Sequence, residues 1–403
     1  MREYVFLVLV AAIITYAATP AVRMLAVRLG AFTPVRDRDV HCEPIPRLGG
    51  VSMLFGFAAA LLVASVLPFS KQMFRTGELW GVLAGAVVLC LVGAIDDVHE
   101  LDWLVKLAGQ LVAAGIMAFQ GVQLFSLPIG STVVLPAPIM VAMTIFCVVL
   151  ATNAVNFVDG LDGLAAGIVA VAAVSFFAYA YLVSRSFSPP NVFTAAAFIS
   201  AALIGVCLGF LPHNFHPARI FMGDSGALLL GLLLAAAMIS VTGTVTAADV
   251  SANSFVALLA PLVVPLSIML LPVLDVTLAV IRRTRRGQSP FQADAQHLHH
   301  RMLQWGHGHR RAVLLLWLWA SVASFGAVAF VFISPYAALG LFVGMALIAL
   351  ALTLWLPKAT IAGRLPVPAA GGGAGRGETD ACDGQQAGPG DAGSRHDLGP
   401  RGC

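Results

Sequence analysis

The sequence predicts an all-α polytopic membrane protein with about eleven transmembrane helices, and three observations support this fold class. Hydrophobic residues make up 59% of the 403 residues, and charged residues only 11%. The mean hydropathy is +0.90, so the chain has more apolar surface than a soluble domain could bury. Apolar runs of about 20 residues, the length that crosses a ~30 Å hydrocarbon core, recur along the chain. A lipid bilayer is therefore the expected environment, and no nucleic-acid partner is expected.

The expected spans follow one another closely and form one transmembrane domain, residues 1–356. They lie near residues 4–26, 48–68, 79–95, 103–119, 135–152, 164–183, 191–211, 225–242, 255–281, 312–334 and 337–356. The first run continues into more helix with Arg23 and Arg28, so we expect it to be retained rather than cleaved as a signal. Residues 121–135 predict a short hairpin. From about Pro357 the composition shifts to Gly, Ala, Pro, Asp and Arg, which predicts a disordered cytoplasmic tail over residues 357–403.

Basic residues are concentrated in every second connection, which indicates the orientation of the chain. The connections after odd-numbered spans contain most of the Lys and Arg, whereas those after even-numbered spans contain only Lys71, Arg75 and Arg185. Basic residues accumulate on the cytoplasmic side of membranes, so we expect the N-terminus outside and the odd-numbered connections in the cytoplasm. Most acidic residues of the connections fall on the same side. The chemistry is therefore expected at the cytoplasmic face of a multi-pass protein of the bacterial plasma membrane.

The first polar motif is the pair Asp96 and Asp97, which directly follows an apolar run, with Lys106 one turn into the next run. Adjacent carboxylates repel each other, so a cation is expected beside them. An acidic group next to hydrocarbon is usually functional, and a solvated helix end is the alternative.

The second motif spans residues 153–163 and places Asn153, Asn156, Asp159 and Asp162 at every third position. Residues three apart share one face of a helix, but over nine residues a regular helix carries the last carboxylate to the opposite side. Gly160 and Gly163 are therefore predicted to break the helix. The four polar side chains would then converge beside a turn where backbone N–H groups can approach a ligand. A polar seam between membrane helices is the alternative.

The third motif runs from His213 to Gly226 and contains Asn214, Phe221 and Asp224. Its Gly-Asp-Ser-Gly sequence is similar to a serine-protease signature, but here it opens a membrane helix and lacks the partners that a serine nucleophile needs. We expect Ser225 to cap this helix, with the Asp224 carboxylate near the positive end of the helix dipole.

The fourth motif is basic and contains His297, His299, His300 and Arg301. The surrounding arginines disfavour zinc and favour an anion such as a diphosphate, bound by charge-assisted hydrogen bonds. A patch that binds anionic lipid is the alternative. With acids in three motifs and bases in the fourth, the sequence predicts carboxylates that hold Mg²⁺, or Mn²⁺ in its place, against a diphosphate substrate.

Together and in this order, the motifs resemble those of the polyprenyl-phosphate N-acetylhexosamine-1-phosphate transferases, a glycosyltransferase 4 type family that includes MraY and the WecA/TagO branch. The resemblance runs from residue 1 to about residue 356. It implies that Asp224 binds the metal, with Asp96 and Asp97 at the metal and the acceptor phosphate. The implied catalytic residues are Asp96, Asp97, Asp159, Asp162, His299 and His300. The implied substrate-binding residues are Lys106, Asn153, Asn156, Gly160, Asn214, Phe221, His297, Arg301 and Arg47, of which Asn214 and Phe221 would contact the uridine.

Two details of the resemblance concern the branch of the family. The His-Leu-His-His spacing of residues 297–300 is more similar to the WecA/TagO branch, which uses UDP-N-acetylglucosamine, than to MraY. MraY-like members carry a lysine shortly before a Gly-Gly pair, whereas residues 41–50 read HCEPIPRLGG and contain no lysine. Arg47 could supply the positive charge from a different place.

The resemblance implies transfer of N-acetylglucosamine-1-phosphate from UDP-N-acetylglucosamine to polyprenyl phosphate, either undecaprenyl or decaprenyl. The products are polyprenyl-diphospho-N-acetylglucosamine and UMP, an initiating step of cell-wall or surface polysaccharide synthesis. Direct attack and a covalent aspartyl intermediate both stay open, as does a homodimer. Two alternatives are an MraY-like phospho-MurNAc-pentapeptide transferase and a transporter. A transporter would need carboxylates near the bilayer midplane, where only Asp275 is expected, and an inverted repeat.

Overall fold

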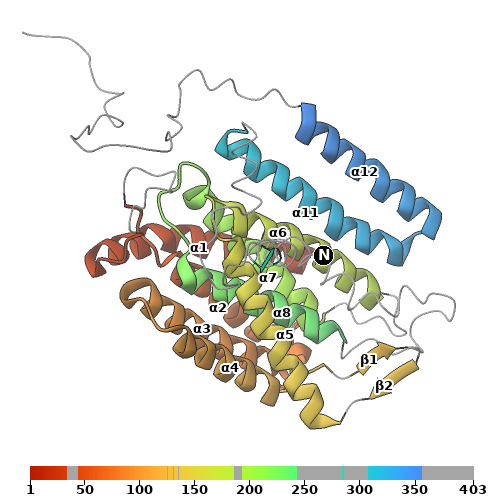
Figure 1. Ribbon diagram of the computed structural model, residues 1–403. Coiled ribbons are helices and arrows are strands. Elements are labelled where there is room, and N and C mark those ends of the chain that lie inside the picture. Colours follow the sequence, from red (N-terminus) through yellow and green to blue (C-terminus); the bar gives the residue numbers. More distant parts are fainter. Residues whose placement is uncertain are drawn as a thin grey trace, which may run out of the picture.

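The computed structural model describes residues 1–33, 44–124, 126–129, 131–134, 136–185, 193–242, 281, 284–285 and 307–355. Within these ranges the chain forms a bundle of ten α-helices with a short 3-10 helix and a two-stranded hairpin (Figure 1). The elements are α1 (Arg2–Leu29), α2 (Gly49–Val66), η1 (Lys71–Phe74), α3 (Glu78–His99), α4 (Trp103–Phe119), β1 (Ser126–Ile129), β2 (Ser131–Val134), α5 (Ala137–Val158), α6 (Leu164–Arg185), α7 (Ala195–Asn214), α8 (Gly223–Thr242), α11 (His309–Phe332) and α12 (Pro335–Trp355).

Each of these ten helices coincides with one of the predicted spans. Nine of them are long and apolar enough to cross a membrane, and α4, with 17 residues, is a shorter apolar helix. The protein is therefore a polytopic membrane protein, as predicted. The hairpin is also confirmed, because β1 and β2 pair in antiparallel register with Ser126 opposite Val134. The expected span near 255–281 and the tail, residues 357–403, lie outside the described residues.

Helix α8 forms the centre of the bundle, where it packs against α2, α3, α5 and α7. Small residues allow this close packing, as is usual between membrane helices. A Cβ atom on Gly231 of α8 would lie only 2.4 Å from Thr152 Cα of α5, and one on Gly93 of α3 would lie 2.5 Å from Ser225 Cα. Helices α11 and α12 lie at one edge of the bundle, and α3 and α4 at the opposite edge (Figure 1).

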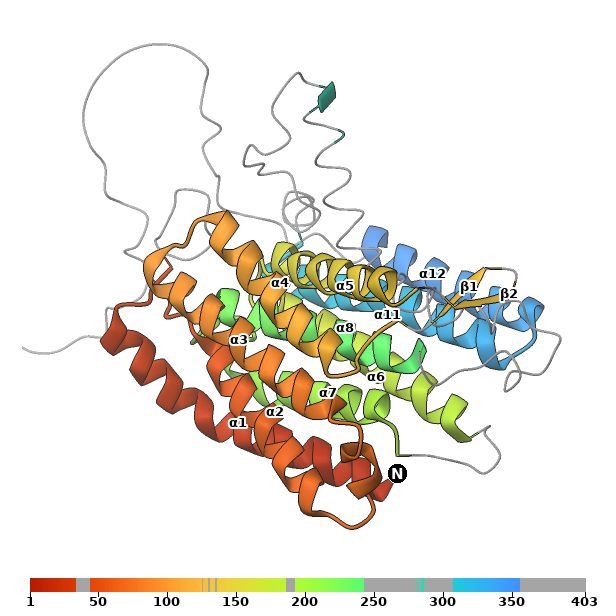
Figure 2. The same ribbon diagram turned by 90° about the horizontal axis from the view of Figure 1, so that it is seen from below.

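The ends of many helices meet at one end of the bundle, which Figure 2 shows from a second direction. The end of α3 contacts the starts of α4 and α8, and the end of α5 also contacts the start of α8. The backbone before α2 is hydrogen-bonded to the backbone before α8. The start of α11 reaches the connection between α7 and α8 through Arg310, whose Nε donates to the His216 carbonyl at 3.0 Å. The connections that follow odd-numbered spans are therefore neighbours in space, as the sequence predicts.

Candidate active site

The acidic pair Asp96 and Asp97 lies in the last turn of α3, which continues to His99 rather than ending near residue 95. Both side chains are buried. The residue after the helix, Glu100, has a left-handed φ of 47°. The chain then turns back, and the Leu101 N–H donates to Asp96 Oδ1 at 2.7 Å. This bond fixes the Asp96 carboxylate against the backbone of the turn that leads into α4.

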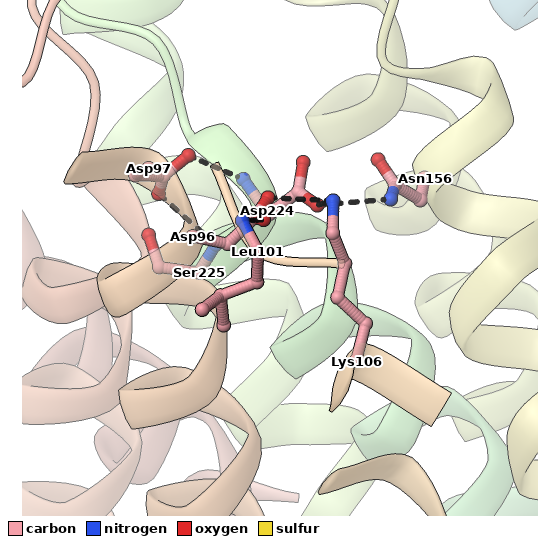
Figure 3. Close-up of polar contacts among 7 residues, drawn as sticks. All are labelled: Asp96, Asp97, Leu101, Lys106, Asn156, Asp224 and Ser225. Atoms are coloured by element: carbon pink, nitrogen blue, oxygen red, sulfur yellow. Dashed lines mark hydrogen bonds and ion pairs between the residues drawn. The ribbon is translucent and has the colours of Figure 1, made fainter. Parts of the chain in front are cut away.

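Lys106 of α4 connects two of the predicted carboxylates (Figure 3). Its ammonium nitrogen lies 2.7 Å from Asp96 Oδ2 and 3.0 Å from Asp224 Oδ2. The side chains of Asp96 and Lys106 are 7% and 28% exposed, so water screens these pairs less than it screens ion pairs on an open surface. Asn156 Nδ2 donates to the same Asp224 oxygen at 3.4 Å. Residues from α3, α4, α5 and α8 thus meet around the carboxylate of Asp224.

Asp97 caps the start of α8 from a different helix. Its Oδ1 accepts the Asp224 N–H at 2.9 Å, and its Oδ2 accepts the Ser225 N–H at 3.2 Å. These are two of the N–H groups that have no partner within their own helix. Gly223 makes the contact sterically feasible, because a Cβ atom there would lie 2.3 Å from Asp97 Oδ2. The expected cap by Ser225 is wrong: α8 already begins at Gly223, and Ser225 Oγ donates to the Met222 carbonyl at 3.1 Å.

The second motif breaks its helix as predicted, since α5 ends at Val158 and Gly163 has a left-handed φ of 75°. The four polar side chains do not share one partner. Asn153 Nδ2 donates to Gln110 Oε1 at 2.9 Å, and Asp162 binds His216 instead. The break is followed by a turn that carries Asp162 toward the α7–α8 connection, away from α3. Among the four, Asn156 is the one that hydrogen-bonds to Asp224.

Asp159 lies at the end of α5, half-buried, between these groups. The pKa of Asp159 is raised from 3.8 to about 8, mainly by burial and also by the negative charges of Asp224 and Asp97, while the positive charge of Arg47 opposes the shift. A carboxylic acid whose pKa lies near neutrality can hold or release a proton at the pH of the cytoplasm. Gly160, which follows it, is exposed in the turn.

A second group forms around Asp162, whose carboxylate is 1% exposed. Its Oδ2 lies 2.8 Å from His216 Nδ1 and 4.0 Å from His309 Nε2, and it accepts the Ala218 N–H at 3.1 Å. Asn214 braces the same turn: its Oδ1 accepts the Gly163 N–H and its Nδ2 donates to the Ile220 carbonyl, each at 3.0 Å. This group ties the starts of α6 and α11 to the α7–α8 connection.

These two groups differ in how well they fit a divalent metal. Asp96 and Asp224 present carboxylate oxygens around one cation, the Lys106 ammonium, and such oxygens are what Mg²⁺ prefers. Asp96 and Asp224 already share a side-chain cation, whereas the Asp97 carboxylate faces the backbone N–H groups of α8, so Asp96 and Asp224 fit the ion best. Asp162, His216 and His309 form the set of three ligand-type side chains found close together within the described ranges. However, the two imidazole rings are stacked, with centroids 4.2 Å apart and planes at 18°, so their in-plane lone pairs do not converge on one ion.

Sequence reasoning missed several residues that support these groups. Gln110 follows Lys106 by four residues, and this helical spacing is a signal that could have indicated a shared face. No local signal links His216 or His309 to Asp162, because they lie on separate elements. His297, His299, His300 and Arg301 lie outside the described residues. Phe221 joins the site through its backbone, which is hydrogen-bonded to Pro46 and Gly49.

Comparison with known proteins identifies the family. Residues 79–242 match the model of the glycosyl transferase family 4. A decaprenyl-phosphate N-acetylglucosaminephosphotransferase of Mycolicibacterium smegmatis is 46% identical over 341 residues, which cover 83% of this chain and 84% of the relative. An undecaprenyl-phosphate alpha-N-acetylglucosaminyl 1-phosphate transferase of Yersinia pestis is 31% identical over 307 residues, 74% and 77% of the two chains. A phospho-N-acetylmuramoyl-pentapeptide-transferase of Desulforudis audaxviator is 34% identical over 337 residues, 76% and 92%.

The matched region contains the helices that carry the Asp96, Lys106, Asn156 and Asp224 side chains, so the site and the family coincide on the chain. The relatives extend the match over most of the remaining transmembrane domain. The chain is therefore a membrane transferase that belongs to the glycosyl transferase family 4.

Proposed function

We propose that this enzyme transfers N-acetylglucosamine-1-phosphate from UDP-N-acetylglucosamine to polyprenyl phosphate and releases UMP. The observation that carries the proposal is the meeting of Asp96, Lys106, Asn156 and Asp224 at one end of an apolar bundle. A site of this kind, charged and at the end of membrane helices, suits a polar donor and a lipid acceptor. The name of the Mycolicibacterium smegmatis relative, at 46% identity, supports the same donor sugar and acceptor class.

The reaction joins two anions, and the residues of the site suit that task. An oxygen of the acceptor phosphate attacks the sugar-linked phosphorus, and the bond from this phosphorus to the UMP oxygen breaks. A phosphate monoester has its second pKa near ~6, so much of the acceptor is already dianionic at neutral pH and needs little help from a base. We assign Asp96 the role of positioning the acceptor beside Lys106. Lys106 supplies positive charge where negative charge accumulates in the transition state.

The proposed metal ligands are Asp224 and Asp96, with Asp97 holding Asp224 in place through the backbone of α8. An Mg²⁺ ion held by these carboxylates would neutralise negative charge on the phosphates. Asn156 orients the Asp224 carboxylate, since it donates to Oδ2. Asp159, with its raised pKa, holds a proton next to the donor phosphates and so limits repulsion between carboxylates and substrate.

The proposed location is the plasma membrane, with the site on the cytoplasmic side. The support is the concentration of basic residues at this end of the bundle, in the connections and in the adjoining parts of helices: Arg23, Arg47, Arg219, Arg310 and Arg311. Basic residues favour the cytoplasmic side, and nucleotide sugars are cytoplasmic substrates. His299 and His300 remain proposed contacts to the donor.

The experiment that tests this function is incubation of the purified full chain in detergent with sugar-labelled UDP-N-acetylglucosamine and polyprenyl phosphate, with and without Mg²⁺. The expected result is label in a lipid product only when Mg²⁺ and the acceptor are both present. A parallel reaction uses the MurNAc-pentapeptide nucleotide as donor. If that donor is the better substrate, the proposed sugar is wrong while the transferase class stands. If neither donor labels the lipid, the proposed function fails.

A further inference from the structure

The segment before α2 carries Arg47, and backbone hydrogen bonds fix it against two other parts of the chain. The Arg47 N–H donates to the Ala31 carbonyl at 2.9 Å, and the Thr33 N–H donates to the Ile45 carbonyl at 3.0 Å. On the other side, the Phe221 N–H donates to the Pro46 carbonyl at 2.9 Å. Arg47 is therefore held between the end of α1 and the residues that lead into α8 and Asp224.

The backbone at the next residue, Leu48, adopts a conformation that residues other than glycine rarely take. Leu48 is buried and has a left-handed φ of 83°, which is a genuine outlier for a bulky residue. Such strain persists only where the surroundings impose it, and it often occurs at ligand sites. Here the next two residues impose it, because the Gly49 N–H donates to the Phe221 carbonyl and the Gly50 N–H to the Met222 carbonyl, each at 3.0 Å. The strained turn fixes the direction in which Arg47 leaves the backbone.

The Arg47 side chain is half-buried, and among the residues that the structure describes only its Nε makes a side-chain hydrogen bond. Its Nε donates to Thr33 Oγ1 at 2.8 Å. Among the described residues no carboxylate lies within ion-pair distance of its guanidinium, whereas Lys106 is shared between Asp96 and Asp224. The two terminal nitrogens of Arg47 form the fork that binds phosphate, and within the described part of the chain they neutralise no carboxylate.

The charge of Arg47 nevertheless reaches the site. Burial and the carboxylates of Asp224 and Asp97 raise the pKa of Asp159, and the positive charge of Arg47 acts against them. Arg47 thus lies near Asp159 without contacting it. A cation that lies near an acidic group of the site, and that forms no ion pair within the described residues, is placed to bind an anion that enters the site.

We propose that Arg47 binds the diphosphate of the nucleotide-sugar donor with its terminal guanidinium nitrogens, while Thr33 holds its Nε and sets the orientation of the fork. This inference rests on the proposed function and adds a positioning residue to it. Two features favour the donor over the acceptor phosphate. Arg47 follows Pro46, which is bonded to Phe221, a proposed uridine contact. The acceptor is assigned to Asp96 and Lys106, whereas the backbone around Arg47 is hydrogen-bonded to residues 221 and 222.

The test compares the binding of UDP and of uridine to the purified full chain by titration calorimetry, for wild type, Arg47→Gln, Arg47→Lys and Thr33→Val. A bidentate charge-assisted contact should make UDP bind more tightly than uridine, and Arg47→Gln should weaken UDP binding by roughly 10-fold or more while uridine binding stays the same. Arg47→Lys keeps the charge but not the fork and should recover part of the loss. Thr33→Val keeps the guanidinium but frees Nε, and should give a smaller loss.

The matched control is Arg23→Gln, because Arg23 is an exposed arginine at the same end of the bundle whose Nε donates to the Arg219 carbonyl at 3.0 Å. It should leave UDP binding unchanged. If wild type transfers the sugar but Arg47→Gln binds UDP as tightly as wild type does, this inference is overturned and the proposed function stays intact. A rise in KM for polyprenyl phosphate alone also overturns it, since Arg47 would then serve the acceptor. If Arg47→Gln does not fold, unchanged UDP binding in both Arg47→Lys and Thr33→Val overturns it.

Discussion

The carboxylate of Asp97 accepts the backbone N–H of Asp224 at 2.9 Å, although the two residues belong to different helices. Asp97 is near the end of α3, and Asp224 is the second residue of α8. A helix start is usually capped by the residue just before it. Here the cap comes from α3, so one bond both completes α8 and fixes the distance between the two acidic groups. The site therefore depends on the packing of these helix ends.

Asp97→Asn should destabilise the protein as well as slow the reaction. One carboxylate oxygen becomes an NH₂ group, which cannot accept from Ser225 or Asp224, so a buried N–H loses its partner at a cost of about 1–2 kcal/mol. Thermal unfolding in detergent should show a lower Tm. Turnover should fall more than UDP-sugar affinity, because the disturbance lies at Asp224. A variant with wild-type Tm, or one that loses only donor affinity, would contradict this role.

Asp224→Asn should keep the fold and lose roughly 10²-fold or more in turnover, the scale of losing one electrostatic contact in a transition state. The backbone N–H that Asp97 binds is unchanged by this substitution. Asp102→Asn is the matched control, since Asp102 is an exposed acid near the same site that caps α4 by accepting the Leu104 N–H at 2.8 Å. Asn caps a helix equally well, so this variant should be active. Near-normal turnover of Asp224→Asn with unchanged Mg²⁺ dependence would rule out its role as a metal ligand.

Lys106→Met should separate charge neutralisation from metal binding. The Lys106 ammonium occupies the same oxygens of Asp96 and Asp224 that the metal would use. Without it, the two carboxylates attract a cation more strongly, so the Mg²⁺ concentration for half-maximal rate should fall by roughly 10-fold, about 1.4 kcal/mol. The maximal rate should fall as well, because the positive charge near the acceptor is lost. An increased Mg²⁺ requirement would show that Lys106 supports the metal rather than competing with it.

Asp159 should make stability depend on pH. Its pKa is raised from 3.8 to about 8 in the fold, so the folded protein holds a proton that the unfolded chain releases. The contribution of Asp159 to the free energy of unfolding is therefore fully present below about pH 4 and is lost as the pH rises toward 8. In Mg²⁺-free buffer, the Tm should therefore fall between pH 5 and pH 8.5, and Asp159→Asn should flatten this dependence relative to Asp102→Asn. The same slope in both variants would mean that another group titrates.

Much of the fold follows from local sequence. Apolar runs of membrane length predict each described helix, because in lipid the backbone must satisfy its own hydrogen bonds. Turn residues predict the hairpin between β1 and β2. The ends of the helices were predicted less accurately, because α3 and α5 each extend several residues beyond the apolar run. Asp96, Asn153 and Asn156 have polar partners on neighbouring helices and can therefore stay within the bundle.

The identities of the site residues were also predictable, but their pairings were not. The sequence motifs indicate Asp96, Asp97, Lys106 and Asp224, which meet as expected. The spacing of Asn153 and Asp162 suggested one cluster, whereas tertiary packing offers Gln110 to the former and His216 to the latter. The strained turn at Leu48, which sets the place of Arg47, arises from backbone pairing with residues 221–222. Contacts between segments more than 40 residues apart leave no periodic signal in the chain.

The most direct test of the central claim uses UDP-N-acetylglucosamine labelled with ³²P in the sugar-linked phosphate. Transfer of the sugar-1-phosphate moves this phosphorus into the lipid, so the account predicts one labelled lipid diphosphate for each unlabelled UMP released. It predicts none in the absence of Mg²⁺, and a rate of lipid labelling lower by roughly 10²-fold or more in Asp224→Asn. Transfer of the sugar alone would instead leave the label in UDP. Labelled UDP together with an unlabelled glycolipid would contradict the account.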